Sequence, residues 1–81
     1  MSQKIQFFCD ADTGIEIRGG RVYEQYQAGD CWYDGRNLGA VPMSETKARR
    51  IVASELRYCD APTQAAALTA LVGRHFAASE A

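Results

Sequence analysis

The chain has 81 residues, a formal net charge of −1 at pH 7 and a hydrophobic fraction of 47%. This length allows one domain, the composition excludes an intrinsically disordered chain, and neither half is basic enough to predict a nucleic-acid binder from charge alone. No signal-peptide core follows Met1, and no apolar run approaches the roughly 20 residues of a membrane-spanning helix. We therefore expect one cytoplasmic domain that covers residues 1–81.

The first half of the chain has the two-residue period of β-strands. Apolar residues alternate with other residues from Ile5 to Cys9, and the alternation resumes at Ile15 after an aspartate-rich break. The Gly-Gly pair at 19–20 favours a two-residue hairpin turn, after which residues 21–27 run back as the next strand.

The length of that turn sets the pairing of the two strands: Arg18 with Arg21, Ile17 with Val22, Glu16 with Tyr23 and Ile15 with Glu24. One face should then be the core face, with Glu24 as its polar exception among Ile15, Ile17, Val22 and Tyr26. The opposite face should present Glu16, Arg18, Arg21, Tyr23 and Gln25.

A second hairpin is predicted between residues 31 and 41. Residues 31–33 form its first strand, Asp34-Gly35 is typical of a type I′ turn, and residues 36–41 return before Pro42 ends the strand. Alternation lets only one of Trp32 and Tyr33 point inward, so one large ring should lie at the surface. The front half therefore contains four or five short strands.

After Pro42 the period of the apolar residues becomes helical. Ser44 is a good N-cap for a first helix over about 45–58, whose predicted inner face is Ala48, Ile51, Val52, Leu56 and Cys59. Either Asp60 or Thr63 caps a second helix over about 63–78, whose predicted inner face is Ala65, Leu68, Leu71, Val72 and Phe76. The predicted fold class is α+β: a small antiparallel sheet of four or five short strands, followed by two helices packed on one face.

The cysteines Cys9, Cys31 and Cys59 are odd in number and contain no Cys-x-x-Cys pair, so we expect reduced, mostly buried thiols. With His75 they could supply four zinc ligands, but structural zinc sites usually use ligands two to four residues apart. A nucleophilic pair of Cys59 with His75 has no orienting acid. No metal and no cofactor is therefore predicted.

The segment Asp10 to Gly14 has the appearance of a catalytic motif. Asp12-Thr13-Gly14 is similar to the catalytic turn of aspartic proteases, and Gly35-Arg36-Asn37 resembles a motif of their retroviral members. In that family an apolar strand leads directly into the aspartate, whereas Asp10 and Ala11 precede Asp12 here. As an Asp-x-Asp motif the segment resembles haloacid-dehalogenase phosphatases, which need a much longer chain, and as a calcium loop it lacks ligands. We interpret it as an aspartate-rich turn and predict no catalytic residues.

The segment Trp32 to Arg36 is the strongest candidate for binding a partner. Trp, Tyr and Arg dominate the energetics of protein interfaces, and here they lie at a predicted hairpin end beside Asp30 and Asp34. The predicted partner-binding residues are Asp10, Asp12, Tyr23, Asp30, Trp32, Tyr33, Asp34 and Arg36.

A basic stripe on the first helix supports an alternative. Lys47, Arg50, Ser54 and Arg57 recur at helical spacing with Arg49 alongside, and such a face could contact phosphates. The alternative nucleic-acid-binding residues are Lys47, Arg49, Arg50 and Arg57.

The predicted function is that of a non-enzymatic protein-binding module. In size, mild acidity and strands-then-helices layout the chain resembles the small inhibitors that phages and other mobile elements encode, anti-CRISPR proteins among them. That resemblance implies binding to a nucleic-acid-handling effector complex, where Asp10, Asp12, Asp30 and Asp34 would meet a channel lined by lysine and arginine. The rival is a small nucleic-acid-binding or regulatory protein, and a homodimer through an exposed strand edge is a further alternative.

Overall fold

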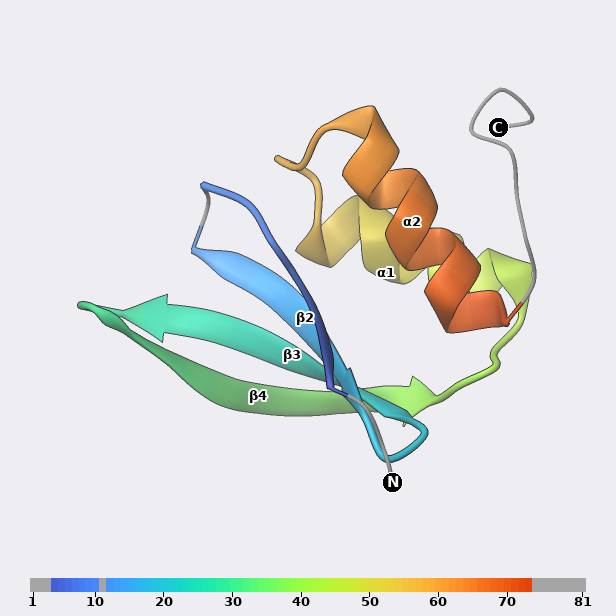
Figure 1. The fold of residues 1–81 in the computed structure, drawn as a ribbon, viewed down its shortest axis with the longest axis horizontal. Helices are drawn as coiled ribbons and strands as arrows, with labels where there is room; N and C mark the ends of the chain where they lie inside the picture. Colours follow the sequence, from blue (N-terminus) through green and yellow to red (C-terminus); the bar gives the residue numbers. More distant parts are fainter. Residues whose placement is uncertain (1–3, 11, 74–81) are drawn as a thin grey trace.

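The computed structural model describes residues 4–10 and 12–73, and it has the predicted α+β architecture (Figure 1). Four strands form one antiparallel sheet in the order β1-β2-β3-β4, and both helices lie on one face of it. The elements are β1 (Ile5–Phe8), β2 (Thr13–Arg18), β3 (Arg21–Ala28), β4 (Cys31–Ala40), α1 (Glu45–Glu55) and α2 (Ala61–Val72).

The pairing of β2 with β3 confirms the predicted register. Arg18 pairs with Arg21, Ile17 with Val22, Glu16 with Tyr23 and Ile15 with Glu24. Both turn residues have the positive φ that a two-residue hairpin requires, 59° at Gly19 and 76° at Gly20.

The hydrophobic core lies between the sheet and the helices. The buried core residues are Ile15, Ile17 and Val22 from the sheet, Ala48, Ile51, Val52 and Leu56 from α1 and its C-cap, and Ala67, Leu68, Leu71 and Val72 from α2. Two predicted core residues differ: Ala65 is only half-buried, and Tyr26 is exposed because it lies where the β3–β4 hairpin extends beyond the helices. Phe76 lies outside the described residues.

The predicted turn at Asp34-Gly35 is wrong, because β4 runs unbroken alongside β3. Two irregularities in the β3–β4 pairing absorb the extra residues, and in one of them Gly35 and Arg36 together oppose Glu24. A Cβ on Gly35 would stand 2.8 Å from Oε1 of Glu24. The glycine therefore makes room for a carboxylate instead of forming a turn.

Both helices begin with a side-chain cap. Lys47 N donates to Ser44 Oγ at the start of α1, and Thr63 N donates to Asp60 Oδ1 at the start of α2, which selects Asp60 over Thr63 as the cap. Each helix ends earlier than predicted, α1 at Glu55 and α2 at Val72, where Gly73 adopts a φ of 66°. Among the described residues, neither helix combines the length and the apolar character that a membrane-spanning segment requires.

Candidate functional site

A polar network covers the sheet face opposite the helices. Glu16 Oε1 accepts a hydrogen bond from Gln6 Nε2 at 2.7 Å, and Glu16 Oε2 accepts one from Arg18 Nη1 at 2.6 Å. The other end of Arg18 reaches Asp34, whose Oδ1 also accepts from Gln25 Nε2 at 2.7 Å. Glu16 and Gln25 are only 5% and 3% exposed, so this face has a buried polar layer of its own.

Hydrogen bonding keeps the carboxylates of this network ionised. Burial alone would raise the pKa of Glu16, but the bonds from Arg18 and Gln6 outweigh it and lower that pKa. The bond from Arg18, followed by that from Gln25, lowers the pKa of Asp34. Asp34 is therefore an internal partner of Arg18, and its charge is already compensated within the sheet.

Two aromatic contacts complete the same face. The Arg18 guanidinium lies 4.0 Å from the ring centroid of Tyr23, and the Trp32 ring stacks on Phe8 with 4.3 Å between centroids. A Cβ on Gly14 would lie 2.3 Å from Phe8 Cδ1, so only glycine lets this ring lie across β2. Trp32 is thus half-buried, and the exposed ring of the Trp32-Tyr33 pair is Tyr33.

A second charged cluster joins the sheet to α1. Arg36 Nε donates to Glu24 Oε1 at 2.9 Å, and Arg36 Nη2 donates to Glu55 Oε2 at 3.0 Å. The bond from Arg36 lowers the pKa of Glu24, whereas burial, followed by the charge of Glu24, raises the pKa of Glu55. Arg36 therefore links β4 to β3 through Glu24 and to α1 through Glu55. Glu24, the polar exception of the core face, is one of its two ion-pair partners.

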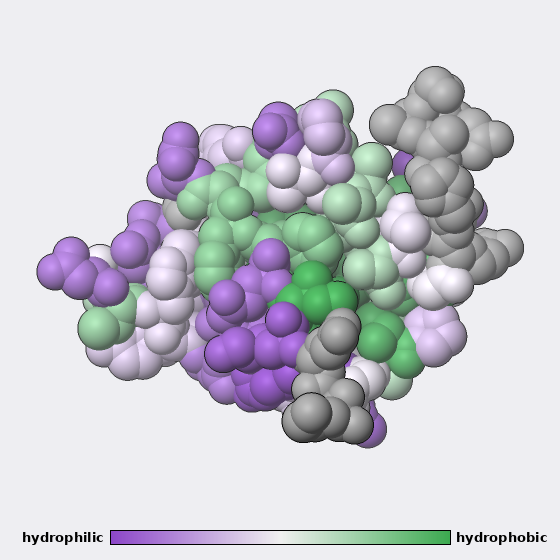
Figure 2. Space-filling model, in the orientation of Figure 1, coloured by the Kyte–Doolittle hydropathy of each residue, from purple (hydrophilic) through white to green (hydrophobic). Residues whose placement is uncertain are grey.

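The end of the sheet that holds the β1–β2 and β3–β4 loops presents the remaining candidates. Gln27 N donates to Asp12 O at 2.9 Å, which joins the β1–β2 loop to the last residues of β3. The rings of Tyr26 and Tyr33 lie 5.9 Å apart on the hairpin that extends beyond the helices (Figure 1), and they are 44% and 48% exposed. Figure 2 shows hydrophilic and hydrophobic residues side by side at the tip of this hairpin, and Asp30, in the turn of the hairpin, is exposed. We define the loop-end surface as Asp10, Asp12, Tyr26, Asp30 and Tyr33.

The predicted partner-binding residues fall into two groups that differ in their contacts within the fold. Asp10, Asp12, Asp30 and Tyr33 lie at the loop end, whereas Tyr23, Trp32, Asp34 and Arg36 are held by contacts within the fold. Sequence reasoning missed Tyr26, because its place in the alternation assigned it to the core. The pairing of Tyr26 with Tyr33 across the strands depends on the uninterrupted β4.

The basic stripe is only partly present. Lys47 and Arg50 are exposed on α1, but Arg49 is paired with Glu45 at 2.8 Å. Arg57 follows the end of α1, donates to Ser54 O and lies over the ring of Tyr58. The stripe was predicted on a helix that continued to residue 58, whereas the chain turns after Glu55 toward Cys59.

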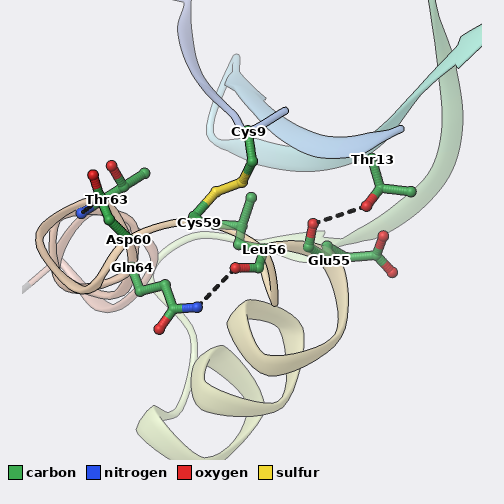
Figure 3. The surroundings of a disulfide bond; sticks show 8 residues. All are labelled: Cys9, Thr13, Glu55, Leu56, Cys59, Asp60, Thr63 and Gln64. Carbon is green, nitrogen blue, oxygen red and sulfur yellow. Dashed lines mark hydrogen bonds between the residues drawn. A yellow bond between two sulfur atoms is a disulfide. The ribbon is translucent and has the colours of Figure 1, made fainter. Parts of the chain in front are cut away.

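The prediction of reduced thiols is wrong for two of the three cysteines. Cys9 and Cys59 form a disulfide with a Cα–Cα distance of 5.1 Å, and Cys31 is free and exposed. The bond joins the end of β1 to the α1–α2 connection, near a hydrogen bond from Thr13 Oγ1 to Glu55 O (Figure 3). An odd cysteine count with a sequence separation of 50 between the partners gives no local signal for this pairing.

The disulfide lies at a surface pocket of about 300 Å³, lined by Phe8, Cys9, Asp10, Tyr58, Cys59, Asp60 and Thr63. Within residues 4–10 and 12–73, no three His, Cys, Asp or Glu side chains are grouped to hold a metal ion. Cys9 and Cys59 bond to each other, so as a disulfide they cannot act as zinc thiolates, and His75 lies outside the described residues.

No protein-family model matches the chain, and no match was found among curated proteins or solved structures.

Proposed function

We propose that the protein is a non-enzymatic protein-binding module that contacts its partner through the loop-end surface. The observation that favours this is the Tyr26–Tyr33 pair, which remains exposed where the β3–β4 hairpin extends beyond the helices. Tyrosine supplies a large, rigid contact area and a hydroxyl group, and it is enriched at the centres of protein interfaces.

The charges of the loop-end surface indicate the kind of partner. Asp10, Asp12 and Asp30 are exposed, and none of their carboxylates pairs with a cation of the described residues. Uncompensated carboxylates beside exposed rings fit a partner surface rich in lysine and arginine, which they would also attract over a distance. Asp34 was predicted to contact the partner together with these three aspartates, but it is not included in the proposed surface because its carboxylate is already paired with Arg18.

The more specific proposal is an inhibitor that occludes a nucleic-acid-handling effector complex, as anti-CRISPR proteins do. A basic channel that binds phosphates is a surface of the required chemistry, and an acidic protein of 81 residues could cover it by steric and electrostatic occlusion. A cytoplasmic location belongs to this proposal. The Cys9–Cys59 disulfide does not favour that location, because disulfides are typical of oxidising compartments.

The test begins with capture of partners by the tagged protein from its native lysate, with and without nuclease. A stoichiometric protein that survives nuclease is then measured against the double variants Tyr26→Ser/Tyr33→Ser and Asp12→Lys/Asp30→Lys. We expect each double variant to bind the partner about 30-fold or more weakly than wild type, as loss of an interface hot spot does. The matched control is Lys47→Glu/Arg50→Glu on α1, which should leave the affinity unchanged. Unchanged binding by both loop-end variants, with folding checked by circular dichroism, would rule this surface out.

The alternative is nucleic-acid binding through α1, and the exposed Lys47 and Arg50 are the observation that favours it. Neither side chain pairs with an acid among the described residues. On this alternative, capture is lost with nuclease, affinity falls steeply with salt, and Lys47→Glu/Arg50→Glu abolishes binding while the loop-end variants do not.

A further inference from the structure

The disulfide lies at a surface pocket of the folded protein. Cys9 follows β1, Cys59 precedes the N-cap of α2, and both are half-buried residues that line the same pocket. The pocket has a volume of about 300 Å³, which is enough for a small organic thiol. Figure 3 shows the two cysteines joining the sheet layer to the α1–α2 connection. The disulfide therefore borders a surface pocket whose volume fits a small thiol.

Two carboxylates line the pocket, and none of its described lining residues is a cation. Asp10 and Asp60 each follow one of the two cysteines in the sequence, and both are exposed lining residues. Arg57 is a cation next to the pocket, with its guanidinium 4.9 Å from the ring centroid of the lining residue Tyr58. One oxygen of Asp60 accepts from Thr63 N, and Asp10 has no ion pair with the described residues. The reacting species in disulfide exchange is an anionic thiolate, so these carboxylates repel it unless it carries a compensating positive charge.

We propose that Cys9–Cys59 is a thiol–disulfide exchange site of the native protein, and that Asp10 and Asp60 select cationic or neutral thiols over anionic ones. This assignment is independent of the proposed function.

The exchange has two balanced steps. The thiolate of a small thiol attacks one cysteine sulfur, forms a mixed disulfide and releases the other cysteine as a thiolate, which takes up a proton. A second thiolate attacks the outer sulfur of the mixed disulfide and releases the second cysteine, which is protonated in turn. Two molecules of thiol are thus oxidised to one small disulfide, and their two electrons reduce the protein disulfide to two thiols.

The experiment uses the full chain with Cys31→Ser, which removes the free thiol and leaves the disulfide as the reacting group. Reduction without denaturant is followed by alkylation and mass spectrometry with cysteamine, 2-mercaptoethanol and 2-mercaptoethanesulfonate. Each rate is divided by the rate of the same thiol on a small neutral disulfide, which removes differences in pKa and nucleophilicity. We expect the rate of reduction to be proportional to thiol concentration. The normalised rate should be highest for cysteamine, intermediate for 2-mercaptoethanol and lowest for 2-mercaptoethanesulfonate. The normalised rates for cysteamine and mercaptoethanesulfonate should differ by about tenfold at low salt and by much less at about 1 M salt.

Two variants assign the selectivity to the pocket. Asp10→Asn removes one charge at a residue without an ion pair, and Asp60→Asn removes the other while retaining a side chain that also caps helices well. Each should reduce the preference for cysteamine over mercaptoethanesulfonate. A reduction rate that does not depend on thiol concentration would mean that the bond opens only on unfolding, and this would overturn the proposal. A preference that is absent, or that both variants leave unchanged, would overturn the role of the carboxylates.

Discussion

Glu16 and Glu55 are both buried carboxylates, but their surroundings shift their pKa values in opposite directions. Two donors surround Glu16, and a glutamine in its place would turn an amide N–H₂ toward the donors that the carboxylate satisfies. We expect Glu16→Gln to lower the free energy of unfolding by about 1–3 kcal/mol near neutral pH. Because the folded pKa of Glu16 is lowered, this loss should shrink as pH falls below about 4. Urea denaturation of wild type and Glu16→Gln at several pH values measures this loss of stability. A loss that does not change with pH would contradict the prediction.

The same measurement on Glu55→Gln should give the opposite trend. The pKa of Glu55 is raised by burial and by Glu24, so its protonated form favours the folded state, and the wild-type protein loses stability as pH rises above about 4.3. Glutamine cannot ionise, and its carbonyl can still accept from Arg36. The stability of Glu55→Gln relative to wild type should therefore increase between about pH 4 and 7. A decrease over this range would show that the ion pair with Arg36 outweighs the burial of the charge.

At the scale of elements, the packing of β1 on β2 depends on Gly14. An added Cβ would meet Phe8 Cδ1 at 2.3 Å and Phe7 O at 2.6 Å, and the latter is backbone that cannot rotate away. Gly14→Ala should therefore shift β1, separate Phe8 from Trp32 and lower the free energy of unfolding by about 1–3 kcal/mol. Trp32 is the only tryptophan, so its fluorescence reports the separation directly. In Gly19→Ala the cost should come from positive φ alone, with tryptophan emission unchanged, because no atom lies within 4 Å of the added Cβ.

At the scale of the whole molecule, the disulfide is the covalent link between the two layers. Closing a loop with a sequence separation of 50 residues removes freedom from the unfolded chain, which corresponds to about 4 kcal/mol at 25 °C. We expect Cys9→Ser/Cys59→Ser to lower the free energy of unfolding by about that amount. The exposed Cys31→Ser is the control and should change it by less than about 0.5 kcal/mol. Equal stability of the double variant and the control would show that the core alone holds the layers together.

The amino-acid sequence by itself determined the features that depend on neighbours along the chain. The Gly-Gly turn set the β2–β3 register, Ser44 set the start of α1, and the apolar periods identified most of the core. Of the candidate site, Asp10, Asp12 and Asp30 could be selected from the sequence and are exposed at the loop end, whereas the alternation left open whether Trp32 or Tyr33 is the exposed ring. Their use in binding remains a prediction.

Only the tertiary structure decided the features that depend on residues distant in the sequence. Asp34-Gly35 is a good local turn, but continuous pairing with β3 and the approach of Glu24 make it part of an uninterrupted strand. Tyr26 is exposed because the helices end before they reach it, and alternation does not show how far a helical layer extends. Cys9 and Cys59 pair because the α1–α2 connection returns to β1. In each case long-range contacts overrode or completed a local preference, and local patterns contain no information about such contacts.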